Sequence, residues 1–344
     1  MPRDSGFTAL VAEVRRDVDA RLSGLFEAER ARALALSPDA HALARSIEAL
    51  TMRGGKRQRA ALVVLGHRLA GGLDDALAHP GAVALELLQT YLLIHDDWMD
   101  GDETRRGGPS VHVMLREHFG GDARRGDAFA VLAGDLSCAM AHEALLAADD
   151  PARAQRAARE LARMTHDVVL GQALDVAGGS SDLARAYDLK TSSYTVRGPL
   201  LVGAALGGAS EALSRALETL AGPIGVAFQL ADDMLGLFGD ERTGKPRGGD
   251  LREGKRTSVI VAAEALLDAE GRATLARGGG PEATPAAREA ALALLADCGA
   301  EAVVRGEIAA LVESSQARIA ALEAPAEARA LLSSAARALT ERSS

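Results

Sequence analysis

Two short acidic clusters interrupt apolar segments of the chain. DDWMD contains Asp96, Asp97 and Asp100 and follows the apolar stretch LELLQTYLLI. A second cluster, Asp232 and Asp233, lies within FQLADDMLGLFGD. On a helix, residues four apart share a face, so Asp96 and Asp100 would point the same way and repel each other. A hard cation such as Mg²⁺, which prefers oxygen ligands, would relieve that repulsion.

Basic residues gather in three glycine-containing stretches, MRGGKRQR, ETRRGG and GKPRGGDLREGKRT. The first lies at an expected helix start, where backbone N–H groups and the helix dipole favour anions. Arginine forks bind phosphate oxygens in pairs. Each stretch alone is typical of a solvated surface, but together with two acidic clusters they indicate a substrate that carries several phosphates and magnesium. The basic residues are Lys56, Arg57, Arg59, Arg105, Arg106, Lys245, Arg247, Lys255 and Arg256.

The segments that must position these groups are predicted to be helical. The 344 residues are rich in good helix formers, aromatic residues make up only 3%, and β-branched runs are scarce. Nearly all prolines fall at breaks between apolar-periodic segments. We therefore predict one all-α domain over residues 1–344, with a flexible surface loop at 276–285. The expected helices are 5–35, 40–52, 56–70, 80–98, 109–117, 125–148, 151–177, 181–197, 199–206, 210–237, 256–269, 285–297, 299–322 and 326–341.

Composition limits the location and the partners. A net charge of -9 and a pI near 5.5 argue against a general nucleic-acid-binding surface. The two cysteines, Cys138 and Cys298, give no disulfide framework and suit a reducing, cytoplasmic location. The N-terminus lacks the apolar core of a signal peptide. Since no uncharged apolar stretch reaches about 18 residues, we expect no membrane span.

Seven motifs occur in a fixed order: GGKRQR, IHDDWMDGDETRRGGPSVH, LAGD, GQALD, KTSSY, FQLADD and GKPRGGDLREGKRT. In this set and order, over residues 45–260, the sequence resembles the trans-isoprenyl diphosphate synthases, the polyprenyl synthetase family. The resemblance implies an all-helical subunit around a deep central cavity, isoprenoid synthase-like, that forms a homodimer. It also implies magnesium-dependent condensation of isopentenyl diphosphate with an allylic diphosphate.

The resemblance also implies a role for each matching residue. Asp96, Asp100 and Asp232 would be magnesium ligands, with Asp97 and Asp233 supporting them, and about three ions would bind with substrate. Lys56, Arg59 and Arg106 would hold isopentenyl diphosphate. The residues around the allylic diphosphate would be Arg105, Lys190, Thr191, Gln229, Lys245 and Lys255, and Gln172 would line the site.

Two positions depart from the family pattern. Gly236 stands where the second motif usually ends in an aspartate, and Asp240 has the wrong spacing to replace it directly. Gln89 stands where many members have a histidine that helps to hold isopentenyl diphosphate. Glutamine can donate a hydrogen bond but cannot be positively charged. We expect activity to survive, with weaker affinity for isopentenyl diphosphate.

Product length should depend on Tyr91 and Leu92, which precede Asp96 by five and four residues. At 1.5 Å per residue they lie about 6 to 8 Å below the metals. In family terms, aromatic residues at both positions stop the product at fifteen carbons, whereas one at the earlier position is typical of twenty. We predict a geranylgeranyl diphosphate synthase. The alternatives are a farnesyl or longer product, a class I terpene cyclase, or a noncatalytic partner subunit.

Overall fold

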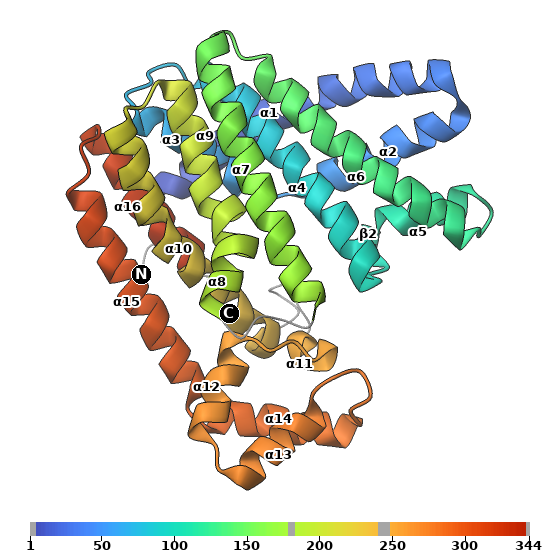
Figure 1. Ribbon diagram of the computed structural model, residues 1–344, viewed down its shortest axis with the longest axis vertical. Helices are drawn as coiled ribbons and strands as arrows, with labels where there is room; N and C mark the ends of the chain where they lie inside the picture. Colours follow the sequence, from blue (N-terminus) through green and yellow to red (C-terminus); the bar gives the residue numbers. More distant parts are fainter. Residues whose placement is uncertain (1–4, 178–182, 240–247, 342–344) are drawn as a thin grey trace.

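The computed structural model describes residues 5–177, 183–239 and 248–341 (Figure 1). It confirms the predicted all-α, single-domain fold. The elements of the first half are α1 (Ser5–Leu36), α2 (Pro38–Met52), α3 (Gln58–Leu69), η1 (Asp75–Ala78), α4 (His79–Asp100), β1 (Thr104–Arg105), β2 (Gly108–Pro109), α5 (Val111–His118), α6 (Ala123–Leu146) and α7 (Pro151–Val176). Those of the second half are α8 (Leu183–Tyr187), η2 (Asp188–Arg197), α9 (Gly198–Gly207), α10 (Glu211–Phe238), α11 (Gly249–Glu253), α12 (Ser258–Leu266), α13 (Ala269–Gly278), α14 (Pro285–Asp297), α15 (Ala300–Ala320) and α16 (Ala326–Thr340).

Helix α4 lies inside the bundle, packed against α3, α6 and α9 (Figure 1). Residues 81–88 are buried without interruption, as expected for a helix that is apolar on all sides. The helix ends at Gly101, whose φ of 70° is left-handed and whose N–H bonds the carbonyl of Asp97. Exposure rises over this last turn, so α4 carries the first acidic cluster from the core to the surface.

Helix α10 is long and continues through a proline. Pro223 has no N–H to offer the carbonyl of Thr219, one turn earlier. Arg318 of α15 donates to that carbonyl instead, at 3.2 Å. The proline therefore leaves no unsatisfied acceptor, and α10 carries the second acidic cluster in its last two turns.

The structure differs from the predicted elements in several places, among them the short 3-10 helix η1, which was not predicted. Residues 276–278, expected in the surface loop, form the end of the unpredicted helix α13, so that prediction was wrong there. The short helix α11 was also missed; glycines at Gly248 and Gly254, each with φ of 73°, bound it. Part of the expected helix 181–197 is the π-helix η2. Within the expected loop DGDETRRGG, β1 and β2 pair antiparallel.

Judged by length and composition alone, two helical stretches, Asp75–Asp100 and Ala123–Leu146, could cross a membrane. In the most apolar part of the first, 67% of the residues are buried inside the protein. The second packs against it. In the most apolar part of the second, 39% of the residues are buried, so the burial typical of a core helix is clear for the first stretch.

Candidate functional site

The first acidic cluster occupies the last turn of α4, with each aspartate in a different environment. Asp100 is exposed, whereas Asp97 is completely buried. The pKa of Asp100 is raised by partial burial and by the charge of Asp96. Burial also raises the pKa of Asp97 to about 6, although its ion pair with Arg105 opposes this. The cluster therefore concentrates negative charge where a cation would be stabilised.

A two-residue hairpin turns Arg105 back toward Asp97. Arg106 and Gly107 form the turn with φ of 53° and 73°. Left-handed values at both central residues are characteristic of tight hairpin turns. Arg105 Nε donates to Asp97 Oδ1 at 2.6 Å, and its Nη2 lies 2.9 Å from Asp102 Oδ2. Asp97 thus orients Arg105, and its buried carboxylate faces the protein interior.

The π-helix η2 connects the two acidic clusters. Lys190 pairs with Asp175 of α7, and its Nζ lies 3.9 Å from Asp96 Oδ1. The next residue, Thr191, donates to Gln229 of α10 at 2.5 Å. Gln172 of α7 donates to Asp96 Oδ1 at 2.9 Å. These contacts bring residues 96, 172, 190, 191 and 229 together, while their roles stay predictions.

Gly171, in the GQALD motif, allows α7 and η2 to pack closely together. A Cβ at Gly171 would lie 2.5 Å from the backbone nitrogen of Lys190, which is too close for any side chain. Only glycine allows α7 and η2 to approach this closely. The contact places Gln172 and Asp175 on either side of Lys190. Asp175, quoted in the motif but given no predicted role, pairs with the lysine.

The carboxylate of Asp233 accepts four hydrogen bonds, which leaves it less available to bind a cation. Gln229 donates to Oδ1 at 2.8 Å, and Tyr187 donates to Oδ2 at 2.5 Å. The N–H and hydroxyl of Ser258 donate to Oδ2 at 3.0 and 2.8 Å. Burial nevertheless raises the pKa of Asp233. Asp233 fastens α10 to α8 and to the start of α12, and no sequence motif indicated Tyr187 or Ser258 as its partners.

Asp232 is half-buried and lies one residue away on a different face of α10. Lys255 follows α11, and its ammonium lies 2.6 Å from Glu253 Oε2. Burial alone would lower the pKa of Lys255, but Glu253, Asp250 and Asp100 together raise it. Lys255 therefore belongs to the same electrostatic environment as the first acidic cluster. Lys245 lies outside the described residues.

The arginines of GGKRQR divide into two kinds. Arg57 is 3% exposed and donates to Asp19, Glu86 and the carbonyl of Thr51, so it stabilises the protein interior. Arg59 donates to Thr195 of η2 at 2.8 Å and lies over the Tyr194 ring, with 4.3 Å to its centroid.

Arg106 lies close to other guanidinium groups. Burial lowers the pKa of Arg106, and the charges of Arg57, Arg59 and Arg105 lower it further. Arg53, which the sequence did not single out, donates to the carbonyls of Arg105 and Pro109 and braces the hairpin. Like charges so placed favour an anion between them. Lys56 of the same motif is exposed.

In the expected product-length region, Tyr91 and the neighbouring His95 interact with α6. Tyr91 packs edge-on against His95, with ring centroids 4.9 Å apart, and burial together with Cys138 and Asp135 of α6 raises its pKa. His95 Nε2 lies 3.1 Å from the carbonyl of Val131, also on α6. Leu92 and Gln89 are half-buried. The side chain of Tyr91 is therefore held in place by His95 and by α6.

The donor set suits magnesium. Carboxylate oxygens are ligands that Mg²⁺ prefers. The negative charges of Asp96 and Asp100 repel each other, and a bound cation would relieve that repulsion. In the described part of the chain, no three acidic, histidine or cysteine side chains are grouped closely enough to hold an ion by themselves. Mg²⁺ commonly completes its shell with water and substrate phosphate, so the residues fit an ion that arrives with a diphosphate.

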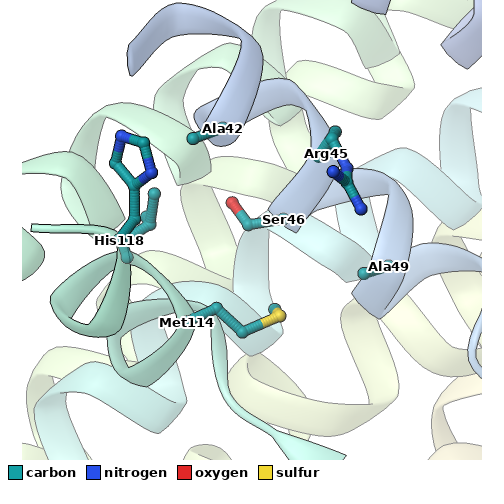
Figure 2. A pocket seen from close by; sticks show the side chains of 7 residues that line it. Ala42, Arg45, Ser46, Ala49, Met114 and His118 are labelled. Carbon is teal, nitrogen blue, oxygen red and sulfur yellow. The ribbon is translucent and has the colours of Figure 1, made fainter. Parts of the chain in front are cut away.

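A hollow of about 260 Å³ lies elsewhere, between α2 and α5 (Figure 2). Its lining is mainly apolar, with Arg45 and His118 as its charged or titratable groups. None of the residues that line it is acidic, so it lacks the donors of a magnesium diphosphate site. The deep central cavity expected from the sequence stays a prediction.

The sequence of the chain is similar to those of known proteins. The family described as Polyprenyl synthetase matches residues 40–293. A (2E,6E)-farnesyl diphosphate synthase of Mycobacterium tuberculosis is 37% identical over 281 residues, 80% of this chain and 70% of that one. A short chain isoprenyl diphosphate synthase of Methanocaldococcus jannaschii is 36% identical over 64% of this chain, and the match spans 65% of that protein.

Similarity extends to the fold. A geranylgeranyl pyrophosphate synthase from Corynebacterium glutamicum, solved in complex with isoprenyl diphosphate and magnesium, superposes with a TM-score of 0.87. It is 30% identical, and the alignment covers 100% of both chains. The match over most of the sequence and the shared all-helical architecture have one explanation: the chain belongs to the polyprenyl synthetase family of trans-prenyltransferases.

Proposed function

We propose that the protein condenses isopentenyl diphosphate with an allylic diphosphate and releases geranylgeranyl diphosphate. The observation that carries the proposal is the connection made by η2. Through Lys190 and Thr191 this helix joins the acidic cluster of α4 to that of α10. One substrate diphosphate with its magnesium ions would fill the space that these groups share.

In this proposal the allylic diphosphate lies between the two acidic clusters. Asp96, Asp100 and Asp232 ligate about three magnesium ions once the diphosphate is bound. Asp97 orients Arg105, and Asp233 fixes the position of Gln229, as their hydrogen bonds favour. The side chains that surround the diphosphate are those of Arg105, Gln172, Lys190, Thr191, Gln229, Lys245 and Lys255.

Isopentenyl diphosphate would lie against the arginine cluster. Arg59, Arg106 and Lys56 supply its positive charge, and Gln89 offers a hydrogen bond in place of a charged histidine. The lowered pKa of Arg106, to which burial and the charges of Arg57, Arg59 and Arg105 contribute, supports this, because an anion would offset that repulsion. Because Lys56 is exposed, its ammonium would contact isopentenyl diphosphate from the edge of the site.

The reaction follows from stabilising the leaving group. Asp96, Asp100 and Asp232 would hold magnesium, which would supply neutralising charge for the departing diphosphate. Arg105, Lys190 and Lys255 add fixed positive charge at the same place. The C=C bond of isopentenyl diphosphate would then attack the allylic cation, and the released diphosphate would take the proton whose loss forms the new double bond. The apolar wall of α4 excludes water from the cation.

Tyr91 and Leu92 support a product of twenty carbons. Leu92 leaves the path below the acids free of an aromatic ring, while Tyr91, held by His95 and α6, narrows it from one side. Relatives differ in the product that their names state: farnesyl diphosphate for the mycobacterial protein and geranylgeranyl diphosphate for the Corynebacterium protein. The product must therefore be measured.

The test is an incubation of the purified protein with farnesyl diphosphate, isopentenyl diphosphate and Mg²⁺, followed by chromatography of the products. We expect a single main product of geranylgeranyl diphosphate, and omission of isopentenyl diphosphate should abolish turnover. No elongation of farnesyl diphosphate would refute the proposed product. Consumption of the allylic substrate alone would instead indicate a cyclase.

A homodimer in the cytoplasm is part of the same proposal. On α6, Leu132 and Leu146 are 52% and 58% exposed, which leaves apolar surface that a second copy would cover. Light scattering of the purified protein should give twice the mass of one chain. A monomeric mass at micromolar concentration would contradict the dimer without affecting the assigned chemistry.

A further inference from the structure

The π-helix η2 is unusual because of its length. It covers ten residues, Asp188–Arg197, whereas π-helical backbone is rare and is mostly confined to single turns within α-helices. The N–H of Gly198, the next residue, still bonds the carbonyl of Ser193, five residues earlier. Lys190 and Thr191, which connect the two acidic clusters, both lie in the first turn of η2. The directions of these two side chains therefore depend on what keeps η2 π-helical.

The packing of η2 explains its position better than its conformation. A Cβ at Gly225 of α10 would lie 2.5 Å from Ser192 Cα, so α10 meets the backbone of η2 directly. Gly171 of α7 is packed against η2 as closely. In a continuous α-helix the ring of Pro199 would clash with the carbonyl of Thr195, four residues earlier, which disfavours an α-helix at the end of η2. Neither feature specifies the conformation of the first turn.

An ion pair joins the two ends of η2. Arg197 Nη1 donates to Asp188 Oδ1 at 2.8 Å and to its Oδ2 at 3.1 Å, and Nη2 donates to Asp167 of α7 at 3.4 Å. The side chain of Arg197 is only 14% exposed. Because Asp188 is the first residue of η2 and Arg197 is the last, this pair spans the whole element.

The separation of the two residues along the chain distinguishes the two helix types. They are nine residues apart. In an α-helix, nine residues make about two and a half turns over about 13.5 Å, so Asp188 and Arg197 would lie on opposite sides. With bonds from each residue to the fifth along, a turn has about 4.4 residues, so nine residues make about two turns and the side chains share a side. The ion pair is therefore compatible with a π-helix and not with an α-helix over the same residues.

We propose that Arg197 is a positioning residue, which keeps η2 π-helical through its ion pair with Asp188. It thereby directs Lys190 and Thr191 into the proposed diphosphate site. The inference rests on the proposed function. Asp167 attaches the same guanidinium to α7, so the ion pair is fixed to a neighbouring helix as well as to η2 itself.

The expected displacement differs along η2. Counted back from Arg197, an α-helix would rotate Lys190 by about a third of a turn from its present direction. Thr195, two residues from Arg197, would rotate by only about a tenth of a turn. Thr195 accepts the hydrogen bond from Arg59, which is assigned to isopentenyl diphosphate. Loss of the ion pair should therefore impair the allylic site much more than the site for isopentenyl diphosphate.

The experiment removes the ion pair from either end. The variants are Arg197→Met, Arg197→Lys, Asp188→Ala, and the double variant Arg197→Met with Asp188→Ala. Arg163→Met is the matched control, because the ion pair of Arg163 with Glu218 joins α7 to α10 rather than to η2. Three quantities are measured for each: the Michaelis constants for farnesyl diphosphate and isopentenyl diphosphate, and the rise in melting temperature caused by Mg²⁺ with inorganic diphosphate.

We expect Arg197→Met and Asp188→Ala each to raise the Michaelis constant for farnesyl diphosphate about tenfold, and that for isopentenyl diphosphate less than about twofold. Both should reduce the ligand-induced rise in melting temperature by about half or more. The double variant should be no worse than Arg197→Met, because both changes remove the same interaction. Arg197→Lys, which keeps the charge, should recover part of the loss. The control should keep both constants even where it lowers the melting temperature without ligand.

The inference fails if Arg197→Met leaves the Michaelis constant for farnesyl diphosphate within about twofold of the wild type, or raises both constants equally. Should Arg197→Met not fold, Asp188→Ala decides by the same criteria, since the Asp188 side chain is 40% exposed. A wild type that makes another product refutes the proposed product and leaves this comparison intact. If farnesyl diphosphate is not elongated at all, the melting-temperature response decides, and an equal response in the wild type and Asp188→Ala overturns the inference.

Discussion

Replacement of Arg57 by methionine should destabilise the protein more than any other single change in GGKRQR. Arg57 is 3% exposed, and its guanidinium donates to Asp19 and Glu86 at 2.8 Å and to the carbonyl of Thr51 at 2.9 Å. Its backbone also has a left-handed φ of 53°, which is unfavourable for a residue with a side chain. The three hydrogen bonds hold it in that conformation and attach α1 and α4 to the start of α3.

The magnitude follows from what the substitution leaves behind. Glu86 is 2% exposed, and its Oε1 already has no hydrogen-bond partner. Without Arg57 it would be a buried carboxylate that has lost its ion-pair partner. Breaking a buried ion pair by removing one partner costs about 3–5 kcal/mol. At about 2 °C per kcal/mol for a protein of this size, the melting temperature should fall by roughly 6–10 °C.

The assay is urea unfolding followed by far-ultraviolet circular dichroism, with Lys56→Met as the matched control. Lys56 is exposed, so its replacement should change the midpoint little. Adding Glu86→Leu to Arg57→Met should recover much of the loss, because it removes the orphaned charge. If Arg57→Met is as stable as Lys56→Met, the reasoning that assigns Arg57 to the interior is refuted.

Three further predictions concern the product, the second substrate and pH. Tyr91→Ala should lengthen the product, measured by chromatography; unchanged length would exclude Tyr91 as the floor of the prenyl site. Gln89→His should lower the Michaelis constant for isopentenyl diphosphate severalfold, because a charged imidazole can pair with the diphosphate, and an unchanged or higher constant would count against that assignment. Burial lowers the pKa of His67, as it does for His79 and His112. Between that lowered value and about 6.5, the unfolded chain binds a proton that the folded protein does not, so this contribution to stability is present above pH 6.5 and is lost as pH falls. The loss of unfolding free energy between pH 7.5 and 5.5 should therefore be smaller in His67→Gln than in the wild type, and an equal loss would show that His67 does not contribute.

Local features made the first acidic cluster predictable. Helix periodicity places Asp96 and Asp100 on one face without any tertiary information, and α4 does end at the glycine that follows them. The helices themselves follow from composition and from proline placement. Errors occurred where glycine obscured the pattern: α11 and α13 are short helices with glycines at or near their ends. The hairpin of Arg105 and Arg106 was read as a loop, because its strands have only two residues each.

The sequence by itself determined the helices, the family and which residues carry charge. Only the tertiary structure decided what each charge does. Arg57 and Arg59 look alike in GGKRQR, yet one pairs with buried Glu86 and the other reaches η2. Asp233 is occupied by Tyr187 and Ser258, and the space beside Gly236 is filled by the side chain of Asp250. Periodicity fixes the face of a helix on which a side chain lies, but its partners depend on which helices pack there, and those come from distant parts of the chain.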